Sequence, residues 1–131
     1  MAAGGESTRP TIVVVDDAAE VRALVRARLR LSGLLDVVGE AGNGAEGYDQ
    51  ATANTVHAVI TDLNMPVMNG IEFIRKYRQH PASKGVPIIL LTTESDETLK
   101  AEAKAAGATG WIVKPFKQDQ LLAVIKKVTG A

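Results

Sequence analysis

Short apolar runs alternate along this chain with longer segments in which apolar residues recur at helical spacing. Five of the runs are brief, rich in Val and Ile and bounded by polar residues, which is typical of parallel strands buried on both faces. The predicted strands cover residues 11–15, 36–41, 56–61, 87–91 and 109–113. The helical spacing predicts five helices, over residues 18–31, 44–53, 71–80, 95 or 96 to 106, and 118–128.

This alternation predicts an α/β fold in which helices cover both faces of a five-stranded parallel sheet. The run at 36–41 (DVVGEA) is the weakest strand candidate of the five. Right-handed crossovers place the carboxyl ends of all the strands at one edge of the sheet. Residues 1–10 are small, polar and rich in Gly, so we expect a flexible arm followed by one domain at 11–131.

Composition excludes several classes of protein. The chain has 131 residues and no cysteine, which excludes a disulfide framework, a thiolate zinc site and a cysteine nucleophile. Its 15 basic and 15 acidic residues cancel, so no overall positive field attracts DNA or a membrane surface. The first ten residues lack the apolar stretch of a secretory signal, and no apolar run is long enough to span a bilayer. We therefore expect a cytoplasmic protein that neither inserts into membranes nor binds DNA.

Polar side chains follow four of the predicted strands. Asp16 and Asp17 follow the first strand, Asp62 the third, Thr92 the fourth and Lys114 the fifth. Ligand sites of open α/β sheets lie at this edge, so we expect these side chains to converge. Crowded carboxylates repel one another and call for a cation, and Mg²⁺ prefers such oxygen ligands. Carboxylate, metal, ammonium and hydroxyl together predict a site of phosphoryl transfer.

Two motifs indicate other chemistries. Residues 42–47 spell GxGxxG with Asp62 twenty residues later, which is typical of dinucleotide binding. The preceding strand is weak, however, and the chain is too short for a catalytic half, so these glycines are better interpreted as a turn into a helix. Asp62-Leu63-Asn64 is similar to the start of the haloacid-dehalogenase phosphatase motif, although the general-acid position is Asn64.

Five motifs together resemble the receiver domain of two-component response regulators. They are VVVDD at 13–17, TDLNMPVMNG at 61–70, LLTTE at 90–94, AGATG at 106–110 and WIVKPF at 111–116. The resemblance covers residues 10–130. It implies the CheY-like, flavodoxin-type doubly wound sheet with strand order 2-1-3-4-5.

The resemblance also implies roles for the phosphorylation site and its metal ligands. Asp62 would be the phosphorylated aspartate and would share in binding Mg²⁺. Asp17, with help from Asp16, and the backbone carbonyl of Asn64 would complete the metal ligands. Lys114 would pair with the phosphoryl group and would precede a cis proline.

Four residues are implied to control the response. Thr92 would be the switch hydroxyl. Trp111 takes the position of the aromatic switch residue, which is usually Tyr or Phe, and the larger indole needs a partner for its N–H. Asn64 and Glu94 would flank the site and tune the lifetime of the phosphorylated state.

Within this family, NMPVMNG and TTE resemble the free-standing chemotaxis regulators. The chain ends soon after the last predicted helix, so we expect a monomer that acts by binding rather than through an attached output domain. The resemblance implies a histidine kinase as phosphodonor and a phosphorylation-dependent protein target such as the flagellar motor switch. A phosphorelay shuttle that passes the group to another histidine, and a small aspartyl-phosphate phosphatase, remain the alternatives.

Some charged positions have no assigned role. Arg22, Arg26, Arg28 and Arg30 make the first predicted helix basic, either as a solvated face or as a docking surface for a kinase phosphotransfer domain. The helical wheel puts Arg28 inside the apolar stripe. His57 is expected inside a strand, and His80 as the C-terminal cap of the third helix.

Overall fold

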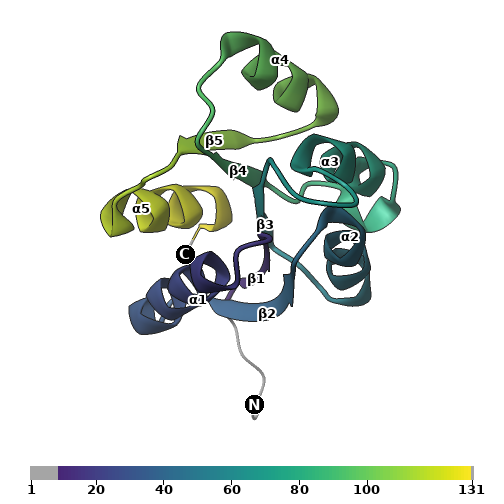
Figure 1. The fold of residues 1–131 in the computed structure, drawn as a ribbon. Helices are drawn as coiled ribbons and strands as arrows, with labels where there is room; N and C mark the ends of the chain where they lie inside the picture. Colours follow the sequence, from purple (N-terminus) through teal and green to yellow (C-terminus); the bar gives the residue numbers. More distant parts are fainter. Residues whose placement is uncertain (1–8, 131) are drawn as a thin grey trace.

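The computed structural model describes residues 9–130, which form a parallel sheet with helices on both faces (Figure 1). The strand order β2-β1-β3-β4-β5 confirms the predicted fold class. The strands are β1 (Thr11–Val15), β2 (Asp36–Ala41), β3 (Ala58–Asp62), β4 (Ile88–Thr92) and β5 (Gly110–Val113). The helices are α1 (Ala19–Ser32), α2 (Gly44–Ala53), α3 (Gly70–Arg78), α4 (Glu97–Ala106) and α5 (Gln118–Thr129), with a short 3₁₀ helix η1 (Pro81–Ser83). Most of the predicted arm lies outside the described residues, whereas Arg9 and Pro10 contact Asp36.

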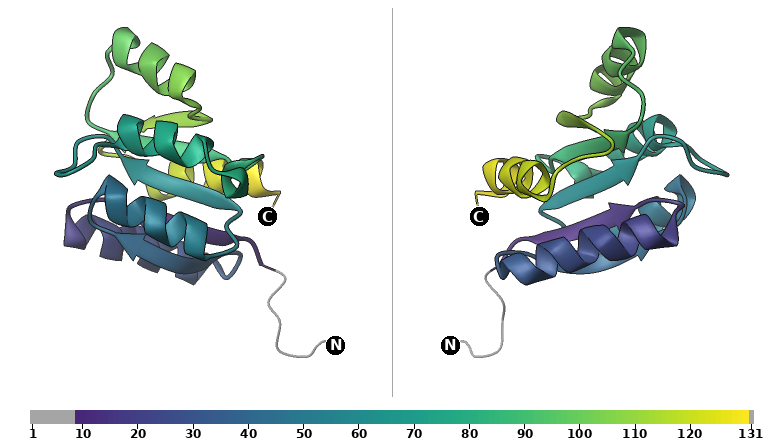
Figure 2. Two further views of the ribbon diagram at one scale, coloured as in Figure 1. Left: turned by 90° about the vertical axis from the view of Figure 1, so that its right-hand side faces the viewer. Right: turned by 60° about the vertical axis from the view of Figure 1, so that its left-hand side comes forward.

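Two apolar cores lie on opposite faces of the sheet. Helices α1 and α5 cover one face, and α2, α3 and α4 cover the other (Figures 1 and 2). Side chains alternate along β1, so Ile12 and Val14 lie in the core under α1 and α5. Val13 and Val15 lie in the core under α2, α3 and α4. Every residue of β3 and β4 is buried, which is why their sequences are almost continuously apolar. Among the described residues, no helix has the length and apolar character needed to cross a membrane.

The boundaries of β3 and β4 differ from the prediction in a way that matters for the site. Strand β3 includes Asp62 and β4 includes Thr92, so both residues are the last of a strand and are held by the sheet. The prediction that His57 lies inside a strand is wrong, because β3 begins one residue later. His57 is exposed, and its Nδ1 accepts a hydrogen bond of 3.0 Å from the backbone N–H of Thr11.

Helix α3 is shorter than its apolar pattern predicts. A capping box starts it, in which the Asn69 side chain accepts from the Glu72 backbone N–H and Glu72 accepts from that of Asn69. The helix ends at Arg78, so His80 is not its C-terminal cap. Instead His80 is the N-cap of η1, where its Nδ1 accepts a hydrogen bond of 3.0 Å from the N–H of Ala82.

The glycines of the GxGxxG stretch serve close packing. Asn43 caps α2, as its side chain accepts from the backbone N–H of Glu46. A Cβ at Gly44 would lie 2.6 Å from the carbonyl oxygen of Met68, and one at Gly47 would lie 2.9 Å from Val15. These contacts support the helix-turn interpretation over dinucleotide binding.

Candidate functional site

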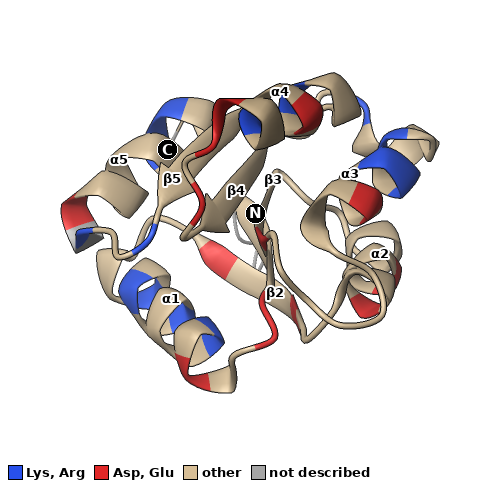
Figure 3. Cartoon of the chain, turned by 45° about the horizontal axis from the view of Figure 1, so that its top comes forward, with Lys and Arg blue, Asp and Glu red and all other residues tan. Residues whose placement is uncertain are grey.

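Three carboxylates meet at the carboxyl edge of the sheet, as their positions after β1 and at the end of β3 predict. One oxygen each from Asp16, Asp17 and Asp62 lies within 4.8 Å of the others. Strands β1 and β3 are neighbours, and Val15 lies opposite Thr61. The next residues along the two strands, Asp16 and Asp62, therefore lie side by side. Asp16 and Asp62 are buried and Asp17 is exposed. Figure 3 looks toward this edge and shows acidic segments at the strand ends.

Lys114 supplies the counter-charge from the end of β5. Its Nζ lies 3.3 Å from Asp16 Oδ2 and 3.2 Å from Asp62 Oδ1. The side chain is 20% exposed, and the two carboxylates are 2% and 10% exposed. The Lys114–Pro115 peptide bond is cis. A single ammonium therefore bridges two buried carboxylates.

Charge crowding and burial shift two pKa values here. Burial raises the pKa of Asp62, and the neighbouring Asp16 raises it further, while Lys114 and the N–H of Leu63 oppose the shift. Burial alone would lower the pKa of Lys114, but the charges of Asp62 and Asp16 outweigh it, so that pKa is raised. Lys114 thus stays cationic, and the carboxylate cluster carries more negative charge than its one ammonium balances.

This imbalance fits a bound cation. Asp17 has no hydrogen-bond or ion-pair partner among residues 9–130, and its oxygen still lies with those of Asp16 and Asp62. Three carboxylates that could hold a metal ion match the hard oxygen ligands preferred by Mg²⁺. Asn64 is exposed two residues beyond Asp62, and the role of its carbonyl stays a prediction.

A chain of hydrogen bonds runs from Thr92 to Trp111. Thr92 is fully buried, and its Oγ1 accepts a bond of 3.0 Å from the backbone N–H of Glu94. The carbonyl of Glu94 accepts a bond of 3.1 Å from Trp111 Nε1. Glu94 is thus the partner that the indole N–H needs, and its backbone joins the two predicted switch residues.

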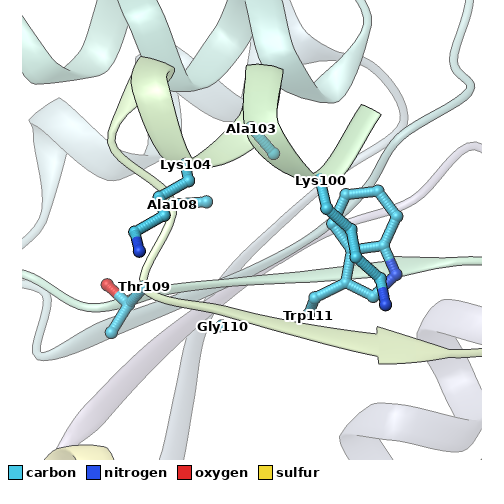
Figure 4. A pocket seen from close by; sticks show the side chains of 7 residues that line it. All are labelled: Lys100, Ala103, Lys104, Ala108, Thr109, Gly110 and Trp111. Carbon is cyan, nitrogen blue, oxygen red and sulfur yellow. The ribbon is translucent and has the colours of Figure 1, made fainter. Parts of the chain in front are cut away.

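Trp111 also lines a pocket between α4 and β5. The pocket has a volume of about 260 Å³ and is lined by Lys100, Ala103, Lys104, Ala108, Thr109, Gly110 and Trp111. Figure 4 shows the Lys100 side chain beside the indole, and its Nζ lies 6.0 Å from the ring centroid. Any movement of Trp111 would therefore change the shape and polarity of this surface.

The basic residues of α1 are less available than the sequence suggested. Arg22 and Arg26 both pair with Glu40 of β2, at 3.7 and 2.6 Å. Arg28 is half-buried, and Arg30 is exposed at the end of the helix. The sequence analysis missed Glu40. The signal for it was an acidic residue on the second predicted strand, which can pair with the basic residues of the helix packed against that strand.

Comparison with known proteins agrees with this geometry. A family model described as the response regulator receiver domain matches residues 12–126. Chemotaxis protein CheY1 of Helicobacter pylori is 37% identical over 120 residues, covering 91% of this chain and 96% of that protein. The chemotaxis protein CheY homolog of Campylobacter jejuni is 38% identical over 120 residues, covering 91% and 92%. The crystal structure of Vibrio cholerae chemotaxis protein CheY4 superposes with a TM-score of 0.87 at 38% identity, covering 92% of this chain and 99% of that one.

Proposed function

The chain belongs to the family of response regulator receiver domains, and from that premise we propose that Asp62 accepts a phosphoryl group from a histidine kinase. The observation that carries this proposal is the contact of Lys114 with both buried carboxylates, 3.2 Å from Asp62 and 3.3 Å from Asp16. It leaves a nucleophilic carboxylate beside a cation that can neutralise an incoming phosphoryl oxygen.

In the transfer, a carboxylate oxygen of Asp62 forms a bond to phosphorus while the phosphorus–nitrogen bond of the phosphohistidine breaks. The electron pair of the broken bond stays on the imidazole nitrogen, which then takes up a proton. Lys114 remains cationic throughout, because the neighbouring carboxylates raise its pKa. Mg²⁺, held by Asp16, Asp17, Asp62 and the carbonyl of Asn64, would supply further neutralisation of phosphoryl charge.

The signal then passes to the surface through Thr92. To donate its O–H to a phosphoryl oxygen on Asp62, the Thr92 hydroxyl would move toward the site and away from the N–H of Glu94, from which it accepts in this structure. Loss of that bond frees the Glu94 backbone, whose carbonyl binds the Trp111 indole. We infer that Trp111, with the face of α4, β5 and α5, has two arrangements whose balance phosphorylation shifts.

The output is a change in protein binding. Both curated relatives named above are chemotaxis proteins, and they match this chain over nearly their full lengths. We therefore infer a role in chemotaxis, with a phosphorylation-dependent protein target such as the flagellar motor switch. Water later hydrolyses the aspartyl phosphate, and we expect Asn64 and Glu94 to flank the site and to set the lifetime of the signal.

Labelling with radioactive acetyl phosphate tests the central step. We expect Mg²⁺-dependent incorporation into the full chain, a slowly decaying product, and no incorporation into Asp62→Asn, whose side chain is isosteric. Retained labelling of that variant would overturn the assignment. Rapid hydrolysis of excess acetyl phosphate would instead support a phosphatase.

A further inference from the structure

Arg22 makes a contact that its place on α1 does not suggest. Its side chain turns back to the end of β1, where Nη1 donates a hydrogen bond of 2.6 Å to the backbone carbonyl of Asp16. Its Nε lies 3.7 Å from Glu40 Oε1, and the other oxygen of Glu40 accepts from Arg26 at 2.6 Å. The planar guanidinium can serve both partners at once because its donors form a rigid fork.

The contact with Arg22 is one of three hydrogen bonds that hold the turn bearing Asp16 and Asp17. The N–H of Asp16 donates to the carbonyl of Ala41 at 3.0 Å, and Asp16 Oδ1 accepts from the N–H of Ala18 at 3.0 Å. The Asp16 carbonyl shares a planar peptide with the nitrogen of Asp17, so holding that carbonyl also sets the direction in which Asp17 leaves the backbone. Asp17 has no side-chain partner of its own among the described residues, so its placement depends on this backbone.

We propose that Arg22, anchored on Glu40, is a positioning residue for the metal site. It holds the Asp16–Asp17 peptide so that the three carboxylates meet within 4.8 Å. The inference rests on the proposed function, since it concerns the affinity of that site for Mg²⁺. Arg22 is also a cation near the cluster, and loss of its charge alone would strengthen Mg²⁺ binding. A weaker affinity in its absence therefore reports lost positioning rather than changed charge.

The test is a Mg²⁺ titration of the full chain, followed by the NMR shift of the Ala18 amide. Partners that orient metal ligands typically contribute tenfold or more to affinity, so Arg22→Gln is expected to raise the Kd about tenfold. Arg26→Gln is the matched control. It removes a cation of the same helix and the shorter contact to Glu40 without touching Asp16, and its Kd should stay within about twofold.

Labelling by acetyl phosphate gives a second measurement. In Arg22→Gln, the Mg²⁺ concentration for half-maximal rate should rise about tenfold, while the rate at saturating Mg²⁺ stays within about twofold. Arg22→Lys keeps the charge and a donor nitrogen but loses the planar fork, so it should recover part of the affinity.

Unchanged or tighter Mg²⁺ binding by Arg22→Gln would overturn the inference. If circular dichroism shows that this variant does not fold, Glu40→Gln carries the test, because it leaves Arg22 in place without its anchor. Loss of the Glu40 charge also weakens Mg²⁺ binding slightly, so the inference requires the Kd to rise by more than about twofold. A Kd within about twofold of the wild-type value in folded Glu40→Gln would then overturn it. Failure of the wild-type chain to bind Mg²⁺ would refute the proposed function instead.

Discussion

Asp62→Asn should make the protein more stable at neutral pH in the absence of Mg²⁺. The folded protein buries the Asp62 carboxylate beside Asp16, and one ammonium serves both. Burial and the charge of Asp16 together raise the pKa of Asp62 in the folded state. An acid with a raised pKa binds its proton more tightly in the folded than in the unfolded chain, so its ionisation opposes folding.

The magnitude follows from charges that nearly cancel. Two unit charges at about 4 Å interact by about 4 kcal/mol at an effective dielectric constant of 20. The attraction of Asp62 to Lys114 and its repulsion from Asp16 are of this size and opposite sign, which leaves the burial penalty uncompensated. Burial of a polar group without full compensation costs about 1–3 kcal/mol in mutational series. We expect a gain of about 1–2 kcal/mol, or roughly 4–8 °C in Tm for a domain of this size.

The pH dependence separates this cause from a change in packing. Below the ordinary Asp pKa of 3.8, Asp62 is neutral in both states, so wild type and Asp62→Asn should be equally stable. The gap should open as pH rises through the raised pKa of the folded state, and then stay constant. Urea unfolding in EDTA from pH 3 to 8 measures it, with Asp49→Asn on the exposed side of α2 as control. A pH-independent gap, or a less stable Asp62→Asn at pH 7, would refute this reasoning.

Three further outcomes are expected. Mg²⁺ should raise the Tm of the wild-type chain by mass action, and Asp17→Ala should remove that response, whereas an equal shift in both would exclude Asp17 as a ligand. Mg²⁺ with beryllofluoride should change Trp111 fluorescence, and Thr92→Ala should abolish the change while Asp62 can still be labelled. If Trp111 fluorescence does not change while Asp62 carries beryllofluoride, the proposed switch role of Trp111 is wrong. Val67 is 83% exposed at φ 68°, so Val67→Asn should stabilise the protein by about 1 kcal/mol in urea unfolding, and a loss of stability would show that this backbone is unstrained.

Much of the site follows from the sequence because strand ends are local features. An apolar run that stops at Asp16, Asp62 or Thr92 shows where a buried strand meets solvent, and parallel topology brings such ends to one edge. The same reasoning predicts Lys114 at this edge, because it follows the apolar run of the fifth strand. It also predicted the sheet itself, including β2, whose weaker pattern reflects its position at the edge, where one side lacks a neighbouring strand.

Other features depended on contacts between distant segments, which no local pattern encodes. The sequence placed Asp16 and Asp17 side by side, but only the packing of β5 against β4 shows that Asp16 is the one that meets Lys114. Likewise, the charges of α1 suggested a free basic face, and only the pairing of β2 with β1 brings Glu40 to Arg22 and Arg26. Side-chain direction at a strand end depends on register and on the neighbouring backbone, so the tertiary structure alone decides which charges meet.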